Sequence, residues 1–204
     1  MDLHNGGLMS MTTWMTRASF LLVASAAALV SACSGSSGAA DTEPPAKTSG
    51  PPACKSSGKN AWETYGQKAF LAVNSSIFAN VDAEMKANGT KNLGNSFNLV
   101  GTGKPPATHD SPADFEAELA AFLVYAYGGP SSITYTDGRS YSGSGIDIVY
   151  FHTGLNITTD QYDYFVMSIV VPALTSNGVP MDDVSSCFAP VVTAPAFVAD
   201  IVGR

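Results

Sequence analysis

The sequence predicts an all-α domain of about five helices over residues 60–204. Apolar residues recur at spacings of three and four through most of this region, as they do on one face of a helix. Two expected helix starts carry a capping box, in which a polar cap residue is followed three positions later by Glu or Gln. No segment sustains the alternation of apolar and polar residues that is typical of a half-buried strand, which argues against a β-sheet core.

The first helix is predicted to start at a capping box formed by Asn60 and Glu63. An apolar stripe at helical spacing follows and ends near Gly89. A polar, glycine-rich stretch then covers residues 88–110. The stripe consists of Phe70, Val73, Ile77, Val81 and Met85.

The second helix is predicted to start with Ser111 as its cap and Pro112 in its first turn. The motif "GGP" at 128–130 ends it. Residues 131–143 lack an amphipathic period and are expected to form a loop, with room for a short hairpin. The apolar face of this helix consists of Phe115, Leu119, Phe122, Leu123 and Ala126.

Three further helices are expected toward the C-terminus. A short one, capped by Ser144 or Asp147, carries His152 and ends at Gly154. The next starts at the capping box "TTDQ" and ends at Asn177-Gly178, with a bend at Pro172. The last starts at Pro180, and two later prolines are expected to break it: Pro190 and Pro195.

The N-terminal residues 1–32 are interpreted as a lipoprotein signal peptide. An apolar core too short for a permanent membrane span ends in small residues directly before Cys33, which is the expected lipidation site. The alternative is an ordinary secretory peptide with a chance cysteine. Residues 33–59 are rich in Ser, Gly and Pro and are expected to be a tether. Ser34 resembles the outer-membrane sorting pattern, so we expect a periplasm-facing domain held at the cell envelope.

Charge and cysteine content narrow the possible partners. The formal net charge of −7 argues against binding nucleic acid and against direct binding to anionic lipid, so membrane contact is expected through the lipid anchor alone. Cys54 and Cys187 form an even pair in an oxidising compartment and are a disulfide candidate. The alternative is two unpaired, buried thiols.

Several common kinds of site are not supported. "GTGK" at 101–104 lacks the earlier glycine and the Ser or Thr of a phosphate-binding loop. Two histidines and a cysteine pair do not make a convincing zinc site. No G-x-S-x-G motif indicates a hydrolase. We therefore expect a binding protein in preference to an enzyme.

His152 is the residue that raises a functional question. It shares an apolar helical stripe with Ile148 and Leu155, so its ring should point inward. One interpretation is a buried histidine that bonds to a carbonyl oxygen. The other is an axial ligand to heme iron, which needs one neutral imidazole in an apolar slot.

A series of motifs, most of them in the second half of the chain, bears on this choice. They are Phe122-Leu123, Gly128-Gly129-Pro130, His152, Ile157-Thr158, Tyr162, Gly178-Val179-Pro180 and Ala194-Pro195. With these motifs the chain resembles the group I truncated hemoglobins over roughly residues 60–202. The resemblance implies the two-over-two helical globin fold, heme b as cofactor and His152 as the proximal iron ligand.

The resemblance also implies an apolar distal pocket. Phe78 stands where the family commonly has a tyrosine, and Phe115 and Leu119 stand where polar residues are frequent. A donor hydrogen bond to dioxygen contributes about 1–3 kcal/mol. Without one, we expect poor retention of oxygen and relatively better binding of carbon monoxide or nitric oxide.

Other positions match the family more loosely. Phe97 corresponds to the phenylalanine that wedges the heme, and Tyr141 and Arg139 lie in the region that meets the propionates. His109 could be a sixth iron ligand, although its loop context favours a solvated side chain. No motif identifies a reductase partner.

Two hypotheses for the function of the whole protein remain: a tethered heme protein that binds a diatomic gas, or a heme-free globin-like module at the cell envelope.

Overall fold

Helices make up most of the chain that the computed structural model describes, which comprises residues 50–87, 93 and 111–204. The mostly helical architecture predicted from the sequence is confirmed. The helical segments are α1 (Ala61–Lys86), α3 (Pro112–Ala126), α4 (Ile148–His152), α5 (Thr159–Tyr164), η1 (Phe165–Val170), α6 (Val171–Ser176), α7 (Met181–Asp183), η2 (Val184–Phe188), α8 (Ala189–Val192) and α9 (Pro195–Ala199).

A small β-hairpin stands in the chain between α3 and α4. Strands β1 (Ser132–Thr134) and β2 (Ser140–Ser142) pair in antiparallel fashion, with Ile133 opposite Tyr141. These two residues are the buried ones in their strands. The loop expected at 131–143 therefore contains a hairpin that turns one side chain of each strand into the core.

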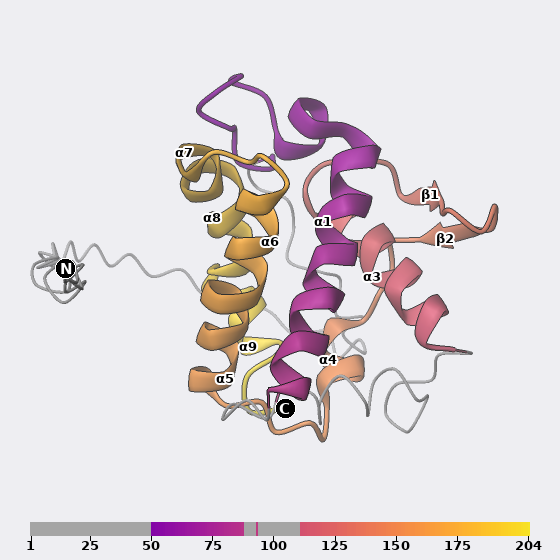
Figure 1. Ribbon diagram of the computed structural model, residues 1–204, viewed down its shortest axis with the longest axis vertical. Helices are drawn as coiled ribbons and strands as arrows, with labels where there is room; N and C mark the ends of the chain where they lie inside the picture. Colours follow the sequence, from indigo (N-terminus) through magenta and orange to yellow (C-terminus); the bar gives the residue numbers. More distant parts are fainter. Residues whose placement is uncertain (1–49, 88–92, 94–110) are drawn as a thin grey trace, which may run out of the picture. The chain divides into compact units, whose positions relative to one another are not determined.

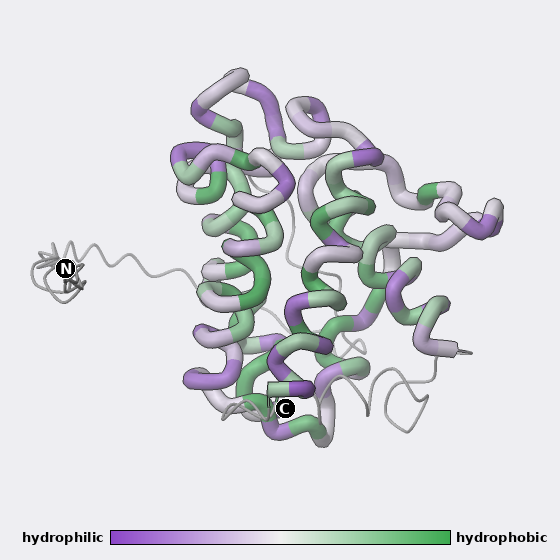
Figure 2. Tube along the Cα trace, viewed as in Figure 1, coloured by the Kyte–Doolittle hydropathy of each residue, from purple (hydrophilic) through white to green (hydrophobic). Residues whose placement is uncertain are grey.

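Helix α1 lies between α3 on one side and the continuous run α5–η1–α6 on the other (Figure 1). Hydrophobic residues recur along α1 and along this run (Figure 2). The buried stripe of α1 includes Phe70, Val73, Ile77 and Val81, as predicted. Burial of these side chains supplies the main favourable term in folding.

The first turn of α1 is held by the predicted capping box. The Asn60 side chain accepts a hydrogen bond from the Glu63 amide, and the Glu63 carboxylate accepts one from the Asn60 amide. Gly66 then has φ +69°, so the helix is kinked one turn after its start. This kink was not predicted, and it needs a glycine because other residues rarely adopt positive φ.

The start and the end of α3 follow the predicted signals. Ser111 accepts a hydrogen bond from the Asp114 amide, with Pro112 in the first turn. At the end, Gly128 has φ +93°. A Cβ atom on Gly129 would stand 2.5 Å from the Val124 side chain, so the "GGP" motif permits a turn that packs tightly against its own helix.

Wide π-helical turns precede two of the prolines. In η1 the Val171 amide bonds to the Val166 carbonyl, five residues earlier, directly before Pro172. The turn η2 precedes Pro190 in the same way. A proline lacks an N–H and crowds the carbonyl four residues before it, and a wide turn accommodates both effects. The break predicted at Pro190 is therefore absent, and the last helical run breaks at Ala194, before Pro195.

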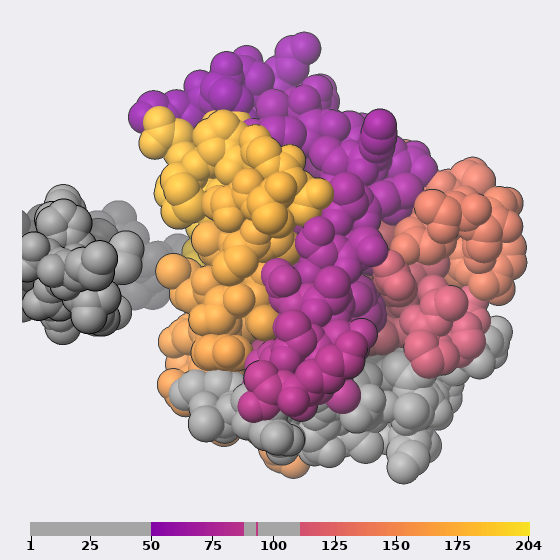
Figure 3. Space-filling view, in the orientation of Figure 1, coloured from indigo at the N-terminus to yellow at the C-terminus, as the bar shows by residue number. Residues whose placement is uncertain are grey.

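Residues 51–59, which the sequence analysis assigned to the tether, are packed against the C-terminal helices. Figure 3 shows the indigo atoms of this segment directly against the yellow atoms of the C-terminal part. Cys54 is bonded to Cys187, and both are buried. The predicted disulfide is confirmed, and it makes the end of the tether part of the folded unit.

Within the described residues, no helix is both long and apolar enough to cross a membrane.

Candidate functional site

The described residues form a partly open cavity of about 610 Å³, a size suited to a cofactor or small-molecule ligand. Its wall is mostly apolar and is formed by residues from nearly every helix and from strand β2. Helices α1 and α3 supply Phe70, Val73, Ile77, Phe115, Leu119, Phe122 and Leu123, and the later elements supply Tyr141, Ile148, Phe151, His152, Leu155, Ile157, Tyr162, Phe165, Val166, Phe188, Val192, Phe197 and Ile201.

The short helix α4 brings His152 to this wall. Asp147 caps the helix by accepting a hydrogen bond from the Tyr150 amide at 2.9 Å. Gly154, with φ +86°, reverses the chain just after the helix. The cap at Asp147 and the stop at Gly154 were both predicted, because each depends on residues within a few positions.

The His152 ring is half-buried and has a defined tautomer. Its Nδ1 lies 2.7 Å from the Ile148 carbonyl oxygen. A carbonyl oxygen can only accept, so Nδ1 carries the proton and donates it. Burial lowers the pKa of His152, and the bond to Ile148 offsets this only in part. The ring is therefore neutral near pH 7, and Nε2 keeps the lone pair that a metal ligand needs.

The other predicted site residues fall into three groups. Phe115, Leu119 and Tyr141 line the cavity together with His152. Phe78 is not part of the wall that the described residues form, and its ring packs edge-on against Phe115 at 5.3 Å. The remaining candidates lie outside the described residues: Cys33, Phe97 and His109.

Tyr141 forms part of the cavity wall, and its hydroxyl is hydrogen-bonded to carboxylates. Its hydroxyl lies 3.0 Å from an Asp114 carboxylate oxygen and 2.8 Å from an Asp137 carboxylate oxygen, so the two acceptors share its single proton. The Arg139 guanidinium bonds to both of these carboxylates and lies over the Tyr141 ring. Arg139, which the resemblance offered for heme propionates, is thus already paired with two acidic side chains.

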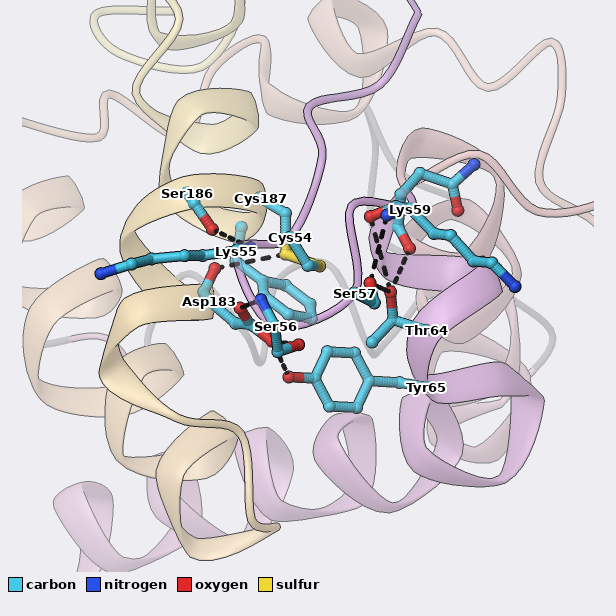
Figure 4. Close-up of a disulfide and its surroundings, with 12 residues drawn as sticks. Cys54, Lys55, Ser56, Ser57, Lys59, Thr64, Tyr65, Asp183, Ser186 and Cys187 are labelled. Atoms are coloured by element: carbon cyan, nitrogen blue, oxygen red, sulfur yellow. Dashed lines mark hydrogen bonds between the residues drawn. A yellow bond between two sulfur atoms is a disulfide. The ribbon is translucent and has the colours of Figure 1, made fainter.

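A second polar cluster fixes residues 54–56 to the C-terminal helices (Figure 4). The buried Asp183 carboxylate accepts hydrogen bonds from the amide and hydroxyl of Ser56 and from the Tyr65 hydroxyl. Burial alone would raise the pKa of Asp183, but these bonds lower it overall. We call the Cys54–Cys187 disulfide together with the Ser56–Asp183–Tyr65 bonds the clasp. Tyr65 also lines the cavity.

The carboxylates in these two clusters should make stability fall in acid. The Arg139 amide, the Tyr141 hydroxyl and the Arg139 side chain lower the pKa of Asp137 to about 2. The pKa values of Asp114 and Asp183 are also lowered. A carboxyl group with a lowered folded-state pKa contributes stability that is present above its ordinary pKa of about 4 and is lost as pH falls through the folded value.

We therefore expect the urea midpoint of unfolding to be nearly constant from pH 7 to 5 and to fall steeply between about pH 4 and 2. The Asp137→Asn variant should start lower at pH 7 and show a shallower fall. A midpoint that is unchanged at pH 3, or an equal fall in the variant, would contradict this assignment.

The sequence analysis placed none of four polar residues in the cavity wall: Glu118, Ser140, Ser142 and Gln161. Glu118 stands three residues after Phe115 on α3, so its helical spacing could have shown that it lies on the cavity wall.

Within the described part of the chain, no group of three or more His, Cys, Asp or Glu side chains could hold a metal ion. A heme iron, however, needs only one protein ligand.

Comparison with protein-family models and with curated proteins finds no match to this sequence. The case for a function therefore depends on the cavity and the residues around it.

Proposed function

We propose that this domain binds heme b, with His152 as the axial ligand to iron, and that it binds a diatomic gas. The main support for this proposal is the position of the His152 ring on the wall of a large, mostly apolar cavity, with its Nδ1 hydrogen-bonded to the Ile148 carbonyl oxygen. This bond orients the ring and leaves Nε2 as the free base. Histidines that ligate metals usually donate their other ring N–H in this way.

The cavity fits such a group in size and in lining. Its volume of about 610 Å³ lies within the range of about 300–1,000 Å³ that is usual for ligand sites. Phe115 and Leu119 line it with apolar side chains and exclude water. Heme would supply an iron centre that binds a diatomic gas. Phe115 and Leu119 cannot donate a hydrogen bond to the bound gas, and the lack of this bond favours carbon monoxide and nitric oxide over dioxygen.

We further propose that the helices form the two-over-two arrangement of a truncated globin. This proposal is supported by the contacts of α1 with α3 and with α6, and by the position of His152 on a short helix between α3 and α6 in the sequence.

We also propose that Cys33 carries a lipid and that residues 33–49 tether the domain at the cell envelope. Metabolic labelling with an alkyne fatty acid, lost in Cys33→Ala, tests the anchor.

Replacing His152 tests the heme proposal. We expect purified wild-type protein to develop a Soret band on titration with hemin, and His152→Ala to lose it or to bind hemin at least about tenfold more weakly. Tyr150→Ala is the matched control, because Tyr150 lies on the same helix with 51% of its surface exposed. Circular dichroism checks that each variant is folded.

Two results would contradict the proposal. The first is a wild-type protein that gives no Soret band after reconstitution, which would favour the heme-free envelope module. The second is a band that persists unchanged in His152→Ala, which would mean that another residue holds the iron.

A further inference from the structure

The cavity wall includes a row of side chains that recur at every fourth position along the continuous run α5–η1–α6. The row consists of Tyr162, Val166, Val170 and Leu174, and all of them line the cavity. A regular α-helix turns by about 100° per residue, so each step of four residues moves a side chain about 40° around the helix axis. Three such steps would place Leu174 about 120° around the helix from Tyr162. A regular helix would therefore turn the end of this row away from the cavity.

The wide turn η1 removes most of this rotation. Its last amide, that of Val171, bonds to the Val166 carbonyl five residues earlier, where a regular helix would use the carbonyl four residues earlier. A turn of this kind holds one residue more than an α-helical turn. The extra residue takes up about 100° of the rotation, so Leu174 lies within about 20° of Tyr162 around the axis.

A second buried row runs beside the first. Ile169 and Ala173 are buried, but neither lines the cavity that the described residues form. The Asn80 side chain of α1 donates a hydrogen bond to the Ile169 carbonyl oxygen at 3.1 Å, which fixes η1 against α1. The two residues at the outer side of the turn, Met167 and Pro172, are exposed. The extra residue is thus accommodated toward solvent, while both buried rows keep their places.

We infer that the extra residue of η1 determines which side chains of this run contact the ligand, and that it makes Val170 and Leu174 ligand-contacting residues. In a regular helix, the position seven residues after Val166 would share its face, and that position is Ala173. The wide turn therefore replaces a small side chain on the wall by the larger, branched Leu174. The identity of the ligand rests on the proposed heme function, whereas the position of the row does not.

Xenon tests the wall directly, because it binds in apolar cavities whatever their natural ligand. Methyl NMR spectra of the purified protein are recorded at increasing xenon pressure. We expect the methyl resonances of Val166, Val170 and Leu174 to shift. Those of Ile169 and Ala173 should shift several-fold less. Equal shifts for the two rows, or no shift at Val170 and Leu174, overturn the inference.

Removing the extra residue is the second test. A variant that lacks Met167 and carries Pro172→Ala can form a regular helix, because the proline that disfavours one is gone. The row then has spacings of four, three and four residues, as in a regular apolar stripe. Met167 is 65% exposed, so its loss removes no core side chain. We expect a Tm within about 5 °C of the wild type, xenon shifts at the same methyl groups and a Kd for hemin within about threefold.

Deletion of Ala72 is the matched control. Ala72 is an exposed residue of α1, beyond the kink at Gly66 and in a stretch without a wide turn. Its loss rotates Ile77 by about 100° relative to Phe70, so we expect the Tm to fall by at least about 10 °C or the chain not to fold.

Two outcomes of the deletions overturn the inference. One is a variant without Met167 that is folded but has lost the xenon shifts of the row, or that does not fold. The other is a deletion of Ala72 that is tolerated equally well. Wild-type protein that shows the xenon shifts and no Soret band with hemin supports the assignment of the wall and contradicts the heme proposal alone.

Discussion

Replacing both Cys54 and Cys187 by alanine is expected to lower the free energy of unfolding by about 4 kcal/mol. The disulfide joins residues separated by 133 positions, so it closes a long loop in the unfolded chain and restricts that state strongly. For a domain of this size the loss corresponds to a fall in Tm of roughly 10–15 °C. Both cysteines are buried, so alanine avoids placing unpaired hydroxyl groups in the core.

Differential scanning calorimetry of the wild type and the double variant measures this effect. Wild-type protein that is unfolded and refolded in reductant, with both thiols free, should approach the Tm of the double variant. Ser186→Ala is a suitable control, because Ser186 accepts a hydrogen bond from the Lys55 amide beside the disulfide and takes no part in the covalent link. A double variant with the Tm of the wild type would show that the disulfide does not stabilise the fold.

Gly143→Ala is expected to destabilise the domain by about 3 kcal/mol or more. A Cβ atom on Gly143 would stand 2.0 Å from the Ala121 carbonyl oxygen and 2.5 Å from its carbonyl carbon. Both atoms belong to the backbone of α3, so no side-chain rotation can relieve the clash. The hairpin end would have to separate from α3, and Tyr141, two positions earlier, would move with it.

Denaturant titration measures the loss, and Gly50→Ala provides the comparison. Apart from its chain neighbours, no heavy atom of the described residues lies within 4 Å of a Cβ at Gly50, so the same change of residue should leave stability within about 0.5 kcal/mol of the wild type. Equal midpoints for Gly143→Ala and the wild type would mean that the hairpin does not pack closely on α3.

The helix starts could be predicted because each depends on neighbouring residues. Asn60, Ser111 and Thr158 cap their helices as expected, and each makes its bond within three positions. The kink at Gly66 could not be predicted, because a glycine inside an apolar stripe does not reveal its φ angle. The wide turn directly before Pro172 was not predicted either, because packing decides whether a helix accommodates a proline in this way.

The candidate site was predictable only where it follows helix periodicity. The inward position of His152 follows from its spacing to Ile148 on α4, and both line the cavity. Leu155 lines it too, although it lies beyond the end of α4, where the helical spacing used for the prediction no longer holds. The same rule places Glu118 on that wall, three residues after Phe115 and one before Leu119. The bond between Ser56 and Asp183 joins positions 127 apart, and no local pattern encodes such a pair.

The clasp determines how a mechanical pull on the N-terminal segment would enter the domain. Force applied before residue 53 meets two attachments in turn: the backbone pairing of Ala53 with Asn60, the cap of α1, and the covalent Cys54–Cys187 bond. The covalent bond carries load into η2, so the cap of α1 does not bear it alone. A domain held by one end is in this way attached through a covalent cross-link as well as through the start of the helix whose Phe70, Val73 and Ile77 line the cavity.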